Sequence, residues 1–129
     1  MGNRAVITTP EKKIGLYLHW NGGKASIEGF LGACREMGFR DPAHDNYGWA
    51  RLAEVCCAFM GNDGLCVGLD RYEVLDRNNG DNGVYIIDGW KIVGREFAPG
   101  YEEEDREKTK AIRERCVALL KKMEEVKDE

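Results

Sequence analysis

Four short segments of the chain combine aromatic rings with amide or charged side chains. They are LHWNGG (18–23), DNYGW (45–49), NNGDNG (78–83) and GREF (94–97). Aromatic rings can stack on nucleotide bases, and guanidinium groups bind phosphate. Each segment lies at the end of an expected strand or helix, where binding residues usually gather. These residue types therefore favour a site for a nucleotide-derived ligand.

In the first segment, His19 and Trp20 could form a stacking platform with a hydrogen-bonding group beside it. Asn21 and the two glycines after it would supply backbone amides and room for a phosphate or ribose. The alternative is that Trp20 packs at a sheet edge, that His19 ends a strand, and that the glycines form a sharp turn.

The second segment opens a helix. Tyr47, Trp49 and Arg51 could surround a flat group, with Arg51 on a phosphate and Asn46 reading a ribose or base edge. Asp45 is a candidate N-cap that would occupy the free N–H groups of this helix. The alternative is that the two aromatic rings anchor the helix to the sheet.

The loop 78–83 offers Asn82 as a further amide, but it does not match the calcium-loop pattern. Arg4 and Arg95 lie within strand patterns and would form a phosphate clamp if their strands were neighbours. Otherwise each arginine belongs to a surface salt bridge, and the loop is a solvated turn.

Enzyme signatures are missing from the sequence. There is no P-loop, no G-x-S-x-G, no H-E-x-x-H and no zinc-deaminase pattern. The five cysteines include no C-x-x-C pair, so we expect reduced thiols that are mostly buried. We therefore expect binding without catalysis, and neither a metal nor a cofactor.

Composition describes an ordinary soluble chain. It has 129 residues, 43% hydrophobic and 33% charged, which suit a single domain over 1–129. The net charge of −4 gives no basic field for DNA. No apolar run reaches the length of a membrane span, and no signal peptide is apparent. We expect a cytoplasmic protein.

Hydrophobic periodicity predicts the elements that position these segments. Alternation indicates strands within 3–9, 13–20 and 65–75, and a hairpin over 84–97 with a type I′ turn at Asp88-Gly89. Helical spacing indicates helices over 26–39, with Ser26 as N-cap and Gly38 at the C-terminus, from Asp45 to Gly61, and within 101–129. The predicted fold is α+β, in the order ββααβββα: an antiparallel sheet of about five strands, two helices packed on it and a long C-terminal helix.

The last helix has two interpretations. Its apolar stripe is formed by Ile112, Cys116, Leu119, Leu120, Met123 and Val126. This stripe could dock on the sheet of its own chain, or it could pair with a partner chain. Because the residues before it are nearly all charged, we expect a helix that is held only at its distal end, and a homo-oligomer.

The string NRAVITT…LYLHWNGG…SIEGFL…DNYGWARL…DNGVYII…GWKIVGRE also resembles a family of small proteins of unassigned activity. Phages and integrative elements of Gram-positive bacteria carry that family, and the similarity covers about residues 2–97. The resemblance implies an accessory role for a mobile element. Small proteins of that origin often counter host defence, either by sequestering a nucleotide signal or by blocking a protein complex.

The residues and the resemblance together predict a counter-defence protein. It would sequester a cyclic ADP-ribose isomer or a cyclic oligonucleotide without turning it over. One alternative is a protein–protein inhibitor of the anti-CRISPR type, which would present an exposed patch. The other is a small nucleotide-processing enzyme with His19 as its base.

Overall fold

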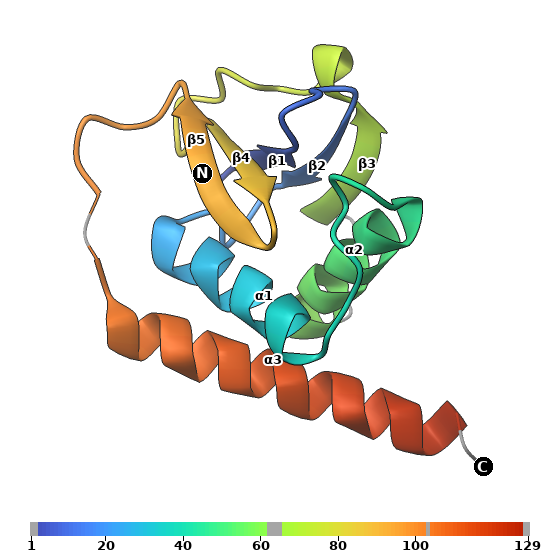
Figure 1. Ribbon diagram of the computed structural model, residues 1–129. Helices are drawn as coiled ribbons and strands as arrows, with labels where there is room; N and C mark the ends of the chain where they lie inside the picture. The colour runs from blue at the N-terminus through green and yellow to red at the C-terminus, as the bar shows by residue number, and fades with distance from the viewer. Residues whose placement is uncertain (1–2, 62–65, 103, 128–129) are drawn as a thin grey trace.

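The computed structural model describes residues 3–61, 66–102 and 104–127, and these form three layers. A five-stranded sheet is the first layer, helices α1 and α2 lie on one of its faces, and helix α3 crosses beneath those two helices (Figure 1). The predicted α+β fold and its order ββααβββα are confirmed.

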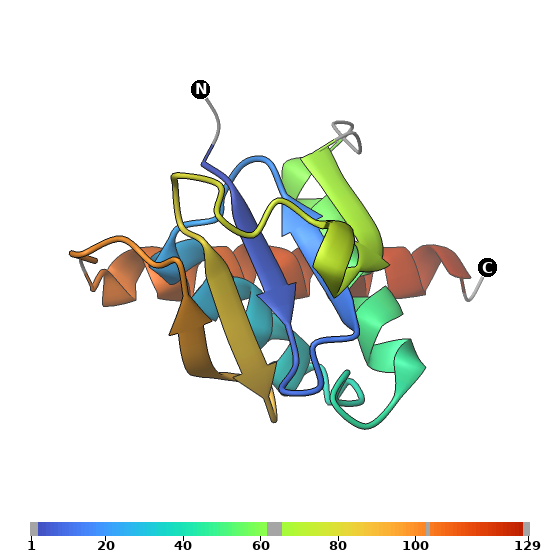
Figure 2. The same ribbon diagram turned by 90° about the horizontal axis from the view of Figure 1, so that it is seen from above.

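The sheet has the strand order β3-β2-β1-β4-β5. Its strands are β1 (Ala5–Thr8), β2 (Ile14–Leu18), β3 (Val67–Arg71), β4 (Val84–Asp88) and β5 (Lys91–Glu96). All neighbouring strands are antiparallel except β1 and β4, so the sheet is mixed rather than wholly antiparallel. The reason is the connection after β3, which crosses the sheet face opposite the helices and delivers β4 beside β1 in the same direction (Figure 2).

Helix α1 (Lys24–Glu36) begins two residues before Ser26, and its N-cap is Gly23, so the predicted serine cap is wrong. Its end is as predicted, because Gly38 has a φ of +70°. Helix α2 (Asn46–Met60) follows the prediction at both ends. The Asp45 side chain accepts a hydrogen bond from the Tyr47 N–H, and Gly61 ends the helix with a φ of +70°.

The main core lies between the sheet and the helices. Alternate strand residues point into it, which is the period-two pattern of a sheet with one helix-covered face. They include Ala5, Ile7, Leu16, Leu18, Tyr85 and Ile87, which are all fully buried. A smaller cluster of Val6, Tyr72 and Val84 lies on the opposite face, where the 3₁₀ turn Tyr72–Val74 and the loop after it cover the sheet.

Helix α3 (Arg106–Lys127) packs on α1 and α2, so the predicted docking of its apolar stripe on the sheet is wrong, and the alternative of pairing with a partner chain stays a prediction. Ile112, Cys116, Val117 and Leu120 are buried there. Gly29 of α1 permits this approach, since a Cβ at that position would lie 2.7 Å from the Ile112 side chain. The predicted homo-oligomer stays a prediction. The Val126 side chain lies outside the described residues.

The β4–β5 hairpin has a two-residue turn, shifted by one residue from the prediction. Asp88 pairs with Lys91, so the central residues are Gly89 and Trp90, with φ of +61° and +59°. Tryptophan tolerates this conformation because its ring is buried and its indole N–H donates to the Phe39 carbonyl at 2.9 Å. Tertiary contacts of Trp90 therefore determine which two residues form the turn.

None of the helices in the described part of the chain has the length and apolar character that a membrane span requires.

Candidate functional site

The ten predicted site residues fall into two separate regions. Six surround the end of the sheet where β1 starts and β2 finishes, which we name the sheet-end region: Arg4, His19, Trp20, Asn21, Asn82 and Arg95. The other four lie in the first turns of α2: Asn46, Tyr47, Trp49 and Arg51.

Arg4 is held by carboxylates of the 76–83 loop. Its Nε lies 2.8 Å from Asp81 Oδ2, its backbone N–H donates to the same oxygen at 3.1 Å, and Asp76 is 3.7 Å away. The hydrogen bond from the guanidinium lowers the pKa of Asp81. Arg4 therefore fastens the loop to the start of β1.

Arg95 holds the same loop from β5. It donates to the carbonyls of Val84 at 3.1 Å and Asn82 at 2.6 Å, and it pairs with Glu102. Its guanidinium lies 3.8 Å from the centroid of the Tyr85 ring. Since β4 separates β1 from β5, the expected clamp of neighbouring strands does not form, and both arginines bind protein groups instead.

The glycine pair at the sheet end brings two stretches of backbone together. A Cβ at Gly22 would lie 2.5 Å from the Asn3 carbonyl oxygen. The Gly22 N–H donates to that oxygen at 2.9 Å, and Gly22 accepts a hydrogen bond from the Tyr85 hydroxyl at 2.7 Å. Gly22 therefore lies close to the start of β1, at the position where the residue types alone suggested room for a ligand.

The aromatic residues of the sheet end contact each other. His19 Nδ1 lies 2.9 Å from the Tyr17 hydroxyl, and its ring meets Trp20 edge-on with centroids 5.2 Å apart. Trp20 is 41% exposed, and Asn21 has a φ of +60°. The sheet-end region therefore has an aromatic surface that is exposed to solvent, but its two arginines, Arg4 and Arg95, are bound to protein groups.

Asn82 lies on a different surface of the same region. Its amide donates to the Arg4 carbonyl at 3.0 Å and to Asn3 Oδ1. It also lines a cavity of about 290 Å³ beside the start of α1, together with Gly23, Ser26 and Tyr101. Two carboxylates, Glu102 and Asp105, and two lysines, Lys24 and Lys108, line this cavity too, so its lining has no excess of positive charge that would favour an anionic ligand.

A larger cavity than this one lies at α2. We name it the α2 groove; it has a volume of about 590 Å³ and is lined by Gly38, Phe39, Arg40, Tyr47, Ala50, Arg51 and Glu54. Pockets of this size hold small-molecule ligands in many proteins. Two of the four predicted residues of this region, Tyr47 and Arg51, lie in it.

Two guanidinium–aromatic pairs line the α2 groove. Arg40 Cζ lies 5.0 Å from the centroid of Tyr47, and Arg51 Cζ lies 5.0 Å from that of Phe39. Tyr47 is 66% exposed. The arginines also pair with surface carboxylates, Arg40 with Asp45 at 3.2 Å and Arg51 with Glu54 at 3.0 Å. Exposed pairs of this kind are weak, so an incoming anion can displace them.

The backbone beneath the groove is fixed by Gly48 and Trp49. A Cβ at Gly48 would lie 2.4 Å from the Arg40 carbonyl oxygen, so only glycine lets α2 start so close to the preceding loop. Trp49 is 6% exposed and belongs to the core, as the anchoring interpretation expected. Asn46 and Trp49 line a second cavity, of about 300 Å³, away from Tyr47 and Arg51.

Sequence reasoning missed Phe39 and Arg40. Both residues follow the end of α1. The conformation of the 37–45 loop brings Phe39 to Arg51 and Arg40 to Tyr47. Aromatic and arginine residues on both sides of that loop could have indicated a binding surface, but the sequence does not reveal which arginine contacts which ring.

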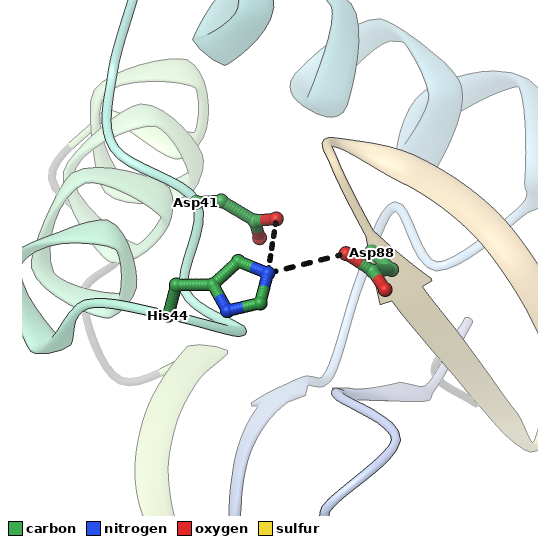
Figure 3. Close-up of side chains that lie close together, drawn as sticks. All are labelled: Asp41, His44 and Asp88. Carbon is green, nitrogen blue, oxygen red and sulfur yellow. Dashed lines mark ion pairs between the residues drawn. The ribbon is translucent and has the colours of Figure 1, made fainter.

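A metal ion could be held by three side chains at another corner of the described structure (Figure 3). Asp41 and His44 come from the α1–α2 loop, and Asp88 ends β4. Their ligand atoms all lie within 4.8 Å of one another. Sequence reasoning missed this cluster as well, because His44 and Asp88 are far apart in the chain.

The cysteines that the structure describes carry reduced thiols, as predicted, and four of the five are buried. Burial raises the pKa of Cys116 to about 12 and also raises the pKa of Cys34 and Cys56. These three thiols stay protonated near neutral pH, so they are poor nucleophiles.

No protein-family model matches the chain, and neither do the curated proteins or the solved structures with which it was compared.

Proposed function

We propose that the protein binds a small nucleotide-derived ligand in the α2 groove and sequesters it without chemical turnover. The observation that carries the proposal is the presence of two guanidinium–aromatic pairs on one groove, with Tyr47 largely exposed. A base can stack on the Tyr47 ring, and Arg40 and Arg51 are placed to meet its phosphates.

The energies suit reversible binding. Base–aromatic stacking contributes about 1–3 kcal/mol per base. Hydrogen bonds to charged groups contribute about 1.5–3 kcal/mol each. One stack and two phosphate contacts exceed the loss of the weak pairs with Asp45 and Glu54, so a ligand can displace both pairs.

The absence of turnover is supported by the groove lining. Among the described residues that line it there is no histidine, cysteine or lysine. Tyr47 and Glu54 are the lining groups that could act as a general base, so incubation with the ligand is the direct test of this part of the proposal. Ligand that is recovered unchanged after long incubation is the expected result.

The biological role that fits is removal of a signalling nucleotide. For a protein of a phage or integrative element, holding a cyclic ADP-ribose isomer or a cyclic oligonucleotide would lower the signal that activates host defence. We retain the homo-oligomer as part of this proposal, with native mass spectrometry as its test, because that measurement also reports ligand carried through purification.

The test is isothermal titration calorimetry with a panel of cyclic ADP-ribose isomers and cyclic dinucleotides. We expect Tyr47→Ala and Arg51→Ala each to weaken binding at least 10-fold and to leave thermal stability nearly unchanged. Arg71→Ala is the matched control, because Arg71 is also an exposed arginine and pairs with Glu73 at 3.0 Å outside the groove. It should bind like the parent protein.

Two outcomes would contradict the proposal. Binding that is lost in Trp20→Ala and kept in Tyr47→Ala would move the site to the sheet-end region. A panel in which no nucleotide binds would remove nucleotide sequestration altogether.

A protein–protein inhibitor is the second candidate, and exposed apolar residues on both edge strands favour it. Leu69 on β3 is 48% exposed, and Val93 on β5 is 58% exposed. Edge strands of this kind can pair with another chain. Stable co-purification of one host protein, lost in Val93→Lys and kept in Tyr47→Ala, would support this candidate.

A further inference from the structure

A histidine and two aspartates converge where the α1–α2 loop meets the β4–β5 turn (Figure 3). His44 Nε2 lies 4.0 Å from Asp41 Oδ2 and 3.9 Å from Asp88 Oδ1. Both distances are too long for a hydrogen bond. The imidazole nitrogen therefore faces two carboxylate oxygens across gaps that an intervening ion can fill.

The cluster is held in place by contacts that do not depend on it. Asp41 Oδ2 accepts a hydrogen bond from the Gly89 N–H at 2.8 Å, and Asp41 Oδ1 accepts one from the Ala43 N–H at 3.0 Å. On the other side of the turn, Arg35 donates to the Trp90 carbonyl at 3.0 Å. Backbone donors that orient a carboxylate in this way are a common feature around metal ligands.

The charge of the cluster favours a divalent cation. Asp41 and Asp88 bring two negative charges together, and within the described ranges His44 is the only ion-pair partner of either one. A neutral imidazole leaves the pair of carboxylates uncompensated, and a neutral imidazole is also the form that binds a metal. One divalent ion balances both charges.

We propose that Asp41, His44 and Asp88 bind one divalent transition-metal ion of the zinc class at this corner. An imidazole with two carboxylates suits zinc, cobalt or nickel, whereas calcium and magnesium prefer all-oxygen sites. Zinc bonds of about 2.0–2.1 Å place tetrahedral ligand atoms roughly 3.3 Å apart, so the three groups must close by about 1 Å.

That closure is within reach of the side chains. His44 and Asp88 are exposed, with 76% and 47% of their side-chain surfaces accessible, while Asp41 is largely enclosed at 18%. The two exposed side chains can rotate toward the fixed carboxylate. Water would complete the coordination, and the ion would tie the loop before α2 to the β4–β5 turn.

The test is calorimetric titration of the chelator-treated full chain with zinc chloride. We expect one ion per chain and a higher melting temperature with zinc. His44→Ala and Asp88→Asn should each lower the affinity for zinc about 100-fold. Magnesium and calcium chloride should bind far more weakly than zinc.

Two controls separate this cluster from the other zinc ligands of the chain. His19→Ala removes the second histidine, and Cys57→Ser removes a partly exposed thiol; both should bind zinc like the parent. Because the His44 side chain is exposed, we expect His44→Ala to fold like the parent, so a loss of zinc affinity reports the loss of a ligand. Circular dichroism checks the fold of this variant. Zinc affinity that is unchanged in both cluster variants, or lost only in Cys57→Ser, or absent in the parent, would overturn the proposal.

Discussion

The sheet-end region and the α2 groove contain the same kinds of residue but use them differently. At the sheet end, Arg95 is 19% exposed and is bound to two carbonyls, a carboxylate and an aromatic face. In the groove, Arg51 is 50% exposed and has one surface carboxylate and one ring as neighbours. Arginines whose donors are already used by backbone groups hold a fold, and those with weak exposed partners are free to bind a ligand.

The strongest way to sharpen this comparison is to disturb the backbone at the sheet end. Gly83 has a φ of +67°, and a Cβ there would lie 2.2 Å from the Phe97 carbonyl oxygen. We expect Gly83→Ala to lower the free energy of unfolding by about 4 kcal/mol, from backbone strain and overpacking together. Urea denaturation measures the change.

The control is Gly68→Ala on β3, where a Cβ would meet no atom within 4 Å. Its effect should stay within about 0.5 kcal/mol of the parent. Equal stability of Gly83→Ala and Gly68→Ala would show that the loop at the sheet end is not fixed as described.

The next largest change in the free energy of unfolding is expected when one arginine is removed from each region. Arg95→Ala removes the hydrogen bonds that this side chain donates to the Val84 and Asn82 carbonyls and its pair with Glu102, so we expect a loss of about 3 kcal/mol. Arg51→Ala removes one exposed pair, and we expect a loss below about 0.5 kcal/mol.

Both values come from the same urea denaturation series. Equal destabilisation of the two arginine variants would contradict the claim that Arg95 holds the fold and Arg51 does not. So would an Arg95→Ala variant that keeps full stability and loses nucleotide binding, because Arg95 would then be a ligand contact.

Alkaline pH gives the smallest expected difference. Burial raises the pKa of Tyr85 from its ordinary value of 10.0, so the folded chain keeps a proton that the unfolded chain releases. The stability that this provides is complete below about pH 10 and is lost as pH rises toward the higher pKa of the folded state. The buried thiols act in the same direction from about pH 9.

We therefore expect Tyr85→Phe to cost about 1 kcal/mol at pH 7, because the Gly22 carbonyl loses its donor, and to lose less stability than the parent between pH 10 and 11. Tyr47→Phe in the groove should match the parent at both pH values. Melting temperatures across the pH range test this, and parallel curves for Tyr85→Phe and the parent would contradict it.

Much of the fold could be predicted because its signals are local. Alternation marked the strands, and the Asp45 cap and Gly61 marked the limits of α2. The parallel β1–β4 pair, the turn at Gly89 and Trp90, and the docking of α3 could not be predicted. Each depends on contacts between residues far apart in the chain, such as the Trp90 indole on the Phe39 carbonyl.

The site followed the same rule. The sequence showed which segments contain residues able to bind a ligand. Whether Arg4 or Arg51 is available to a ligand depends on how strongly Asp81 and Glu54 hold them, and residue types alone do not reveal these ion pairs. The Phe39–Arg51 and Arg40–Tyr47 pairs arise only when Gly48 lets α2 start against the preceding loop.

The parallel pair of β1 and β4 has a consequence for the chain during its synthesis. Val6 pairs with Val84, so β1 reaches the ribosome exit early and then has β2 as its only partner until β4 has been made. During that interval the centre of the future sheet is an open strand edge, and open edges pair readily with other chains. Slow translation before Val84 would therefore favour aggregation of the nascent protein, whereas slow translation after β5 would be harmless to the sheet.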